Sequence, residues 1–168
     1  MNTMSQQRGM GLVEVLVAIL VLAIGVLGFV ALQYRAVEAT AESVYRVQAV
    51  NLARDLAERI RVNRGAFATY ATQLQTPANQ PASTKNCFTS TSCNAAEMAD
   101  FDVAQVTTRA TSTAMTMNLL DCQGNLNARQ CVYVAWGDTS ATDGTGVVDC
   151  TNSTSYNPAS TCIIMEVY

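Results

Sequence analysis

A single carboxylate lies at the start of an otherwise uncharged, apolar stretch of the chain. Glu14 is followed by Val15–Leu32, a run of eighteen residues without a charged side chain. An ionisable group in lipid is costly, so such a residue marks a functional position by default. The alternative interpretation is an ordinary signal peptide or anchor, in which Glu14 is tolerated near the lipid headgroups.

The cysteines are the second group of residues with chemistry of their own. The chain has six cysteines and no histidine. An even number of cysteines in an exported domain indicates disulfides, and the lack of a C-x-x-C motif argues against redox catalysis and zinc binding. The lack of histidine removes Ser-His-Asp and Cys-His catalysis. We therefore expect no enzymatic activity, no cofactor and no metal site.

The spacing of the cysteines favours pairing between nearest neighbours in the sequence. Six cysteines allow fifteen pairings in principle. Short loops favour the nearest-neighbour set, and a predicted hairpin brings its middle pair together. The favoured pairs are Cys87–Cys93, Cys122–Cys131 and Cys150–Cys162. Disulfides at these positions would compensate for a thin core and long polar loops.

Four arginines, Arg54, Arg59, Arg61 and Arg64, form a basic cluster. A cluster of this kind contacts nucleic acid or an acidic partner subunit, or it complements the carboxyl end of a helix. The formal net charge of the chain is −3, and no aromatic residues interleave with the arginines. These features favour a partner subunit or a solvated helix end over nucleic acid.

Three aspartates in a glycine-containing segment are candidate calcium ligands. Asp138, Asp143 and Asp149 lie around Gly144 and Gly146. Carboxylate oxygens bind Ca²⁺, but the spacing does not match an EF-hand loop. A solvated turn is the favoured interpretation.

The element that positions Glu14 is a helix long enough to cross a membrane. Val15–Leu32 would span roughly 27 Å as a helix, close to the ~30 Å of a bilayer core, and Met10–Val13 extends it. The positive-inside rule places the Arg8 end in the cytoplasm and the body outside. A Sec signal cleaved at the A-x-A site Ala39–Ala41 is the alternative.

The helix is predicted to continue from Met10 to about Gly65. Its second half is amphipathic, and this pattern predicts that one face packs on a soluble domain. The segment 66–94 reads as a polar loop, and 95–118 as a helix with Asn94 as its N-cap. Strands are predicted at 119–123, 129–137, 147–150 and 162–168, with loops at 138–146 and 152–160.

The segment Gly9–Glu14 resembles the leader junction of type IV pilins. A short basic leader ends in Gly9, an apolar residue follows, and Glu14 is fifth in the mature chain. The resemblance implies that a prepilin peptidase cuts between Gly9 and Met10 and methylates the amine of Met10. It also implies that Glu14 pairs with this amine on a neighbouring subunit and sets the register of assembly.

A second segment resembles the PilV branch of minor pilins. The run Asp55–Asn63 reads D-L-A-E-R-I-R-V-N, which that branch favours in its long helix. The implied fold is α+β, with the long helix packed on a small antiparallel sheet, and Cys150–Cys162 resembles the C-terminal disulfide loop of pilins. The implied domains are a leader (1–9), a membrane and polymerisation half of the helix (10–32), an amphipathic half (33–65) and a globular pilin domain (66–168).

The resemblance implies a minor pilin that primes assembly of the type IV pilus and is incorporated at its tip. Adhesion and twitching motility would follow. The implied partners are other minor pilins, the major pilin, prepilin peptidase, the inner-membrane assembly platform, membrane lipid and a tip adhesin, without nucleic acid. The implied location is the bacterial inner membrane before assembly and the pilus afterwards. The alternatives are a minor pseudopilin of type II secretion and a DNA-uptake receptor.

Overall fold

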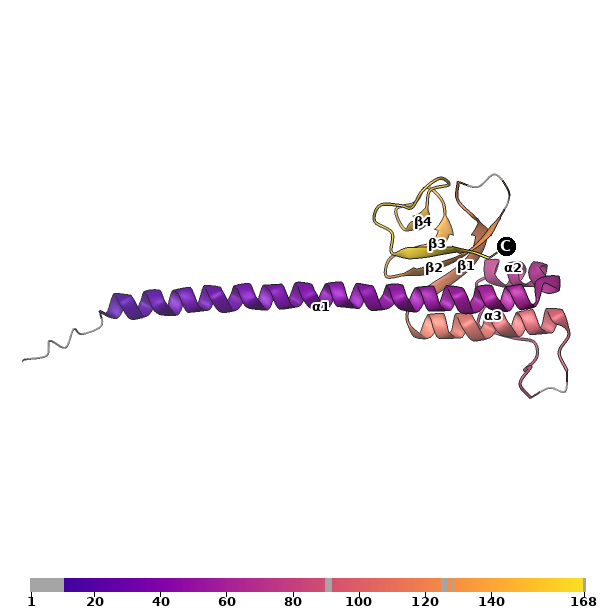
Figure 1. Cartoon of the computed structure of the whole chain (residues 1–168), viewed down its shortest axis with the longest axis horizontal. Coiled ribbons are helices and arrows are strands. Elements are labelled where there is room, and N and C mark those ends of the chain that lie inside the picture. The colour runs from indigo at the N-terminus through magenta and orange to yellow at the C-terminus, as the bar shows by residue number, and fades with distance from the viewer. Residues whose placement is uncertain (1–10, 90–91, 125–126, 128, 168) are drawn as a thin grey trace, which may run out of the picture. The chain divides into compact units, whose positions relative to one another are not determined.

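Helix α1, Leu12–Val62, is the longest element of the chain (Figure 1). The computed structural model describes residues 11–89, 92–124, 127 and 129–167. The chain divides into two compact units, 1–43 and 44–168, and α1 contributes to both. Residues 12–62 contain no proline, which is consistent with an uninterrupted helix. The described part of the first unit consists of Gly11 and residues 12–43 of α1.

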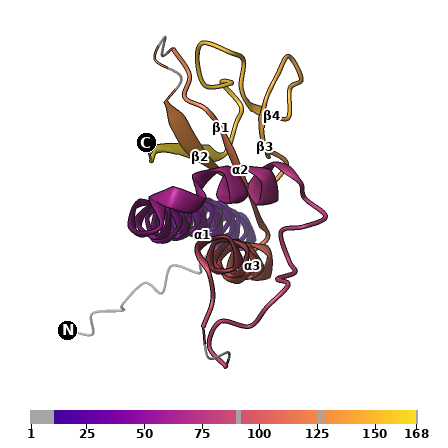
Figure 2. The same cartoon turned by 90° about the vertical axis from the view of Figure 1, so that its right-hand side faces the viewer.

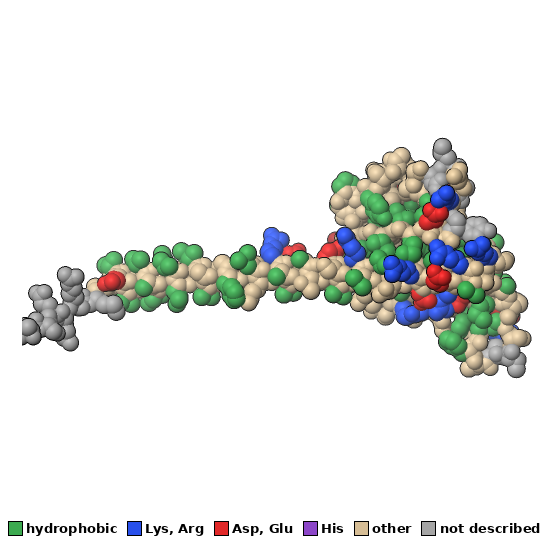
Figure 3. Space-filling model, viewed as in Figure 1, with side chains coloured by type: hydrophobic (Ala, Val, Ile, Leu, Met, Phe, Trp, Pro, Cys, Tyr) green, Lys and Arg blue, Asp and Glu red, His purple; other side chains and the backbone are tan. Residues whose placement is uncertain are grey.

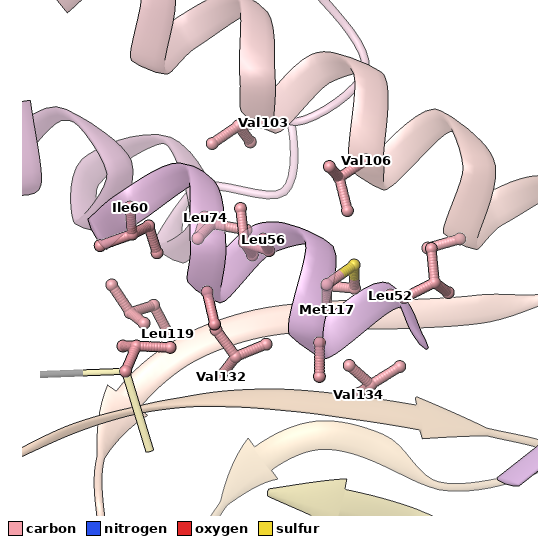
Figure 4. Packing of buried hydrophobic residues seen from close by; sticks show 14 of the residues in the cluster. Leu52, Leu56, Ile60, Leu74, Val103, Val106, Met117, Leu119, Val132 and Val134 are labelled. Atoms are coloured by element: carbon pink, nitrogen blue, oxygen red, sulfur yellow. The ribbon is translucent and has the colours of Figure 1, made fainter. Parts of the chain in front are cut away.

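In the second unit, α1 lies between α3 and the sheet (Figure 2). Its buried residues recur every three or four positions, as expected for one face of a helix. Side chains from α2, α3, β1 and β2 pack around this face (Figure 4). The predicted amphipathic half is therefore the centre of the core. The buried residues of α1 are Ala49, Leu52, Ala53, Leu56, Ala57 and Ile60.

The segment after α1 is helical, and the loop predicted for residues 66–94 is wrong over its first part. A short 3₁₀ helix, Arg64–Ala66, leads into α2, Phe67–Gln75. Tyr70 and Leu74 are fully buried against the core. Their spacing of four is helical, but the alanine, threonine and glutamine residues around them hide the pattern. Burial against the core therefore stabilises a helix that could not be predicted from the composition of this segment.

Helix α3, Ala95–Ser112, begins where the sequence predicts and ends earlier. Asn94 accepts a hydrogen bond from the Glu97 amide, and the Glu97 side chain accepts one from the Asn94 amide, which makes a capping box. The predicted extension to residue 118 is wrong, because Ala114 has a φ of 56° and a strand starts at the next residue. Alternate burial from residue 115 onward is the period of a strand.

The main sheet has three antiparallel strands in the order β1-β2-β5. They are β1, Met115–Asp121, β2, Gln130–Trp136, and β5, Cys162–Glu166. The central strand β2 is buried on both faces, since one face meets the helices and the other meets a second cluster that includes Ala141 and Cys150. This α+β architecture confirms the predicted fold class.

A parallel pair of short strands covers the second face of the sheet. These strands are β3, Ser140–Asp143, and β4, Asp149–Thr151. The predicted loop 138–146 is therefore wrong at β3, and the strand predicted at 147–150 is shifted toward the C-terminus. Both strands are rich in polar residues and therefore resemble loops in the sequence. These polar residues bond between the two strands, since Thr142 donates to Asp149 and Thr151 donates to Asp143.

Candidate functional site

The first turn of α1 carries Glu14 on an apolar surface. The Glu14 amide donates to the Gly11 carbonyl at 2.9 Å, and the side chain is exposed. Gly9 and Met10, the predicted cleavage and methylation positions, lie outside the described residues. In the described chain, the site therefore consists of a carboxylate and the apolar helix that carries it.

The apolar side chains of the first unit are exposed all around the helix. Leu12 is 78% exposed, and Leu32 is 72% exposed. The space-filling view shows these side chains along the helix, with one acidic group near its start (Figure 3). By length and composition, α1 contains a segment able to cross a membrane. Such a surface needs lipid or other helices to cover it.

In the second unit, charged residues join α1 to α3 and α2. Arg59 donates from Nε to Asp55 Oδ1 at 2.8 Å and from Nη1 to Asp102 Oδ1 at 2.5 Å. Arg109 Nη2 forms an ion pair with Asp55 Oδ2 at 2.7 Å. The Tyr70 hydroxyl donates to Asp102 Oδ2 at 2.6 Å. Two arginines thus balance two aspartates. Asp55 Oδ2 is buried and is held by the ion pair with Arg109 alone, since it accepts no hydrogen bond of good geometry.

Burial and hydrogen bonding shift the pKa values of this network. Partial burial lowers the pKa of Arg59, but its hydrogen bonds to Asp55 and Asp102 outweigh burial and raise it. Burial, and then the hydrogen bond to Asp102, raise the pKa of Tyr70. Both groups therefore keep their protons at ordinary pH. The network fixes the packing of three helices, and we infer no proton-transfer role for it.

Models of known protein families match the amino-terminal helix and the segments that follow it. A family model described as type IV pilin Tt1218 matches residues 31–104. A second model, the prokaryotic N-terminal methylation motif, matches residues 4–30. The chain is a type IV pilin. No curated protein and no solved structure gives a significant match.

The family determines the class of activity and the location of the pilin. Type IV pilins are structural subunits rather than enzymes, so the expectation of a non-enzymatic role is confirmed. The methylation motif is a processing site for prepilin peptidase, and a pilin interacts with other components of the pilus. The motif and the apolar helix fit anchoring in the inner membrane, followed by incorporation into the pilus.

The arginines of the basic cluster lie in different environments in the structure of the pilin. Arg59 faces the helix interface described above, whereas Arg61 forms a surface ion pair with Glu58 at 2.8 Å. Arg54 is exposed on α1, and Arg64 is exposed at the start of the 3₁₀ helix. The four arginines therefore do not act as one site. Sequence reasoning missed Asp102 and Tyr70, although an aspartate between Phe101 and Val103 in an apolar helix is a recognisable signal of a buried ion pair.

Three disulfides hold the globular part of the pilin. They join Cys87 to Cys93, Cys122 to Cys131, and Cys150 to Cys162. The second closes the β1–β2 connection, and the third ties β4 to the start of β5. Because each loop is short, each disulfide restrains a local segment of the unfolded chain.

Two of the three aspartates considered as calcium ligands, Asp143 and Asp149, accept hydrogen bonds from protein donors, whereas Asp138 is exposed. Asp149 accepts from the Thr142 hydroxyl at 2.5 Å and from the Gly146 amide at 2.8 Å. Burial raises the pKa of Asp143, but hydrogen bonds from Ser153 and Thr151 outweigh burial and lower it. Among the described residues, no three potential ligands gather as a metal site. Asp143 and Asp149 therefore order the loop around β3 and β4.

An open groove of about 510 Å³ lies beside α3. Phe101 lines it and meets Phe88 edge-to-face, with ring centroids 5.0 Å apart. Arg59 and Arg109 also line the groove, but both are paired with Asp55. The groove therefore presents cations that are already neutralised, and its charge does not favour an anionic ligand.

Proposed function

We propose that this protein is a minor pilin of the PilV type, which joins other minor pilins to prime pilus assembly and stays at the tip. The observation that carries the proposal is the run Asp55–Asn63, which resembles that branch. In the structure, Asp55 and Arg59 of this run connect α1 to α3. The run thus has a physical role in holding the globular domain on the long helix.

Assembly would depend on the amino-terminal segment. We propose that prepilin peptidase removes residues 1–9 by cutting between Gly9 and Met10, and that it methylates the new amine. Glu14 of one subunit would pair with this amine on its neighbour. The exposed carboxylate on an otherwise apolar surface supports this proposal, because pairing removes the cost of a lone charge in lipid.

The wider partners follow from the same role. The major pilin would continue the filament, the inner-membrane platform would extract the subunit from lipid, and a tip adhesin would contact the minor-pilin complex. Adhesion and twitching motility would depend on this complex.

The first experiment determines the amino terminus by mass spectrometry of membranes, with and without prepilin peptidase. N-methyl-Met10 should appear only when the enzyme is present. A chain that starts after Ala41, or that keeps Met1 in both strains, would contradict the proposed processing.

The second experiment separates a minor pilin from other roles. Deletion of the gene should reduce the number of surface pili, and the subunit should be rare relative to the major pilin in sheared filaments. A subunit that makes up most of the filament would contradict the minor role. A deletion that stops protein secretion and leaves pili intact would indicate a pseudopilin, and one that stops only DNA uptake would indicate a DNA receptor.

A further inference from the structure

Strand β5 forms one edge of the main sheet. It follows β2 at the end of the order β1-β2-β5, and the structure pairs no other described strand with its outer side. The Trp136 amide donates to the Thr161 carbonyl, and the Val167 amide donates to the Gln130 carbonyl, both at 3.0 Å. In an antiparallel ladder, every second residue bonds the neighbouring strand. The backbone groups of Cys162, Ile164 and Glu166 therefore face outward.

The middle of this outer edge is occupied by a side chain from a different segment. The Ile164 amide donates to the Tyr156 hydroxyl at 3.0 Å. Tyr156 belongs to the loop closed by the Cys150–Cys162 disulfide and forms an isolated bridge with Thr151. Its hydroxyl takes the place that the carbonyl of an added strand would occupy.

The edge has the composition of a strand that pairs readily. Its first four residues, Cys162–Met165, are apolar and only partly buried. A hydrophobic edge strand with unpaired backbone groups is a template for association unless something blocks it. The charged end is also engaged, because Glu166 forms an ion pair with Arg129 at 3.0 Å.

We infer that the outer edge of β5 is a strand-pairing surface that Tyr156 keeps closed, and that the occupant it excludes is the same edge of a second copy. Antiparallel pairing centred on Ile164 would place Ile163 opposite Met165 and Cys162 opposite Glu166. The three central positions would then pair apolar side chains, each Glu166 would lie opposite a disulfide-bonded Cys162, and no like charges would face each other. The edge is therefore complementary to itself.

The exclusion is steric as well as chemical. An added strand runs about 4.8 Å from the edge, and the Tyr156 hydroxyl, 3.0 Å from the Ile164 nitrogen, lies in that space. Tyr156 must leave before a strand can bind. This device does not depend on the proposed role at the pilus tip, because it concerns contacts between copies of the globular domain.

The test compares four forms of the full chain in dodecyl maltoside micelles, by light scattering over a range of concentrations. They are the wild type, Tyr156→Ala, Ile164→Pro and the double variant. Proline is tolerated on an edge strand where the missing amide faces outward, so Ile164→Pro should keep the bonds between β2 and β5. It should nevertheless block an added strand.

Tyr156→Ala should at least double the mean molar mass relative to the wild type, and the double variant should return to the wild-type mass. Wild-type mass for Tyr156→Ala at every concentration would overturn the inference. Equal association of Tyr156→Ala and the double variant would overturn it too, since the contact would then lie elsewhere.

A second variant decides the case in which Tyr156→Ala fails to form the Cys150–Cys162 disulfide. Tyr156→Phe keeps the ring and removes the hydrogen-bond acceptor. Hydrogen exchange of the Ile164 amide should become about tenfold faster, as expected for the loss of one hydrogen bond. An unchanged exchange rate would show that the hydroxyl does not close the edge and would overturn the inference.

Discussion

Residues 12–43 and 44–62 belong to the same helix, yet they are covered in different ways. In the first part, leucine, isoleucine and valine side chains are exposed around the whole circumference. In the second part, one stripe that includes Leu56 and Ile60 is fully buried by the rest of the chain. The second part obtains its stability from this chain, whereas the first part needs lipid or other subunits. Changes in the two parts should therefore affect different measurements.

The largest expected effect is on assembly. If Glu14 pairs with a neighbouring amine, Glu14→Ala should reduce incorporation into pili by about tenfold or more, because a buried cation loses its partner. Quantitative mass spectrometry of sheared pili measures this. The thermal unfolding of the 44–168 unit in the full chain should not change. Normal incorporation of the variant would break the proposed role of Glu14.

The second prediction sharpens the comparison within α1. Leu56→Ala should destabilise the protein by about 2–5 kcal/mol, because the change leaves a cavity in the core. The matched control is Leu22→Ala, since Leu22 is 69% exposed in the first part. Denaturant unfolding of the full chain in micelles, followed by the fluorescence of Trp136, measures both. Equal losses for the two variants would contradict the division of α1.

The third prediction concerns the buried network. Asp102→Asn should cost about 2–3 kcal/mol, because it leaves the Arg59 guanidinium without one carboxylate and weakens the Tyr70 hydrogen bond. Asp138→Asn is the matched control, since Asp138 is exposed. The same unfolding measurement applies. A loss no larger than that of the control would show that the network contributes little to stability.

The smallest effect should appear in the acid limb of the pH–stability curve. The backbone hydrogen bond from Asn94, followed by that from Lys85, lowers the pKa of Glu97 below its usual value of 4.5. Because the folded-state pKa is depressed, the stabilisation is present above about pH 4.5 and is lost as the pH falls through the lower folded-state value. Glu97→Gln should flatten this part of the curve. A curve that keeps its slope would exclude the capping box as the cause.

The sequence predicted the structure correctly where the residues that decide it lie close together in the chain. The apolar run after Glu14 and the amphipathic pattern up to Ile60 each lie within one helix, so their periodicity can be read directly. The same holds for Asn94, whose capping partner Glu97 is three residues away. These signals predicted the long helix, the α+β class and the pilin resemblance.

The sequence misled where neighbours distant in the chain decide the structure. The helix at 67–75 forms because Tyr70 and Leu74 reach a core built by other elements. The turn at Ala114 and strand β1 form because Met115, Met117 and Leu119 face that core. Propensity alone does not reveal either choice, since tertiary packing outweighs a weak local preference.

The sequence by itself determined that this protein has an apolar amino-terminal segment that carries one carboxylate, because composition and spacing there can be interpreted without any other segment. Only the tertiary structure decided which charged side chains pair inside the domain and which backbone amide at the edge of the sheet is bonded by a side chain. Arg59 meets Asp102 across 43 positions, and Tyr156 meets the Ile164 amide through a loop closed by a disulfide. Both contacts depend on how the chain folds back on itself, and the pairing of a charge or a backbone amide depends on distance in space.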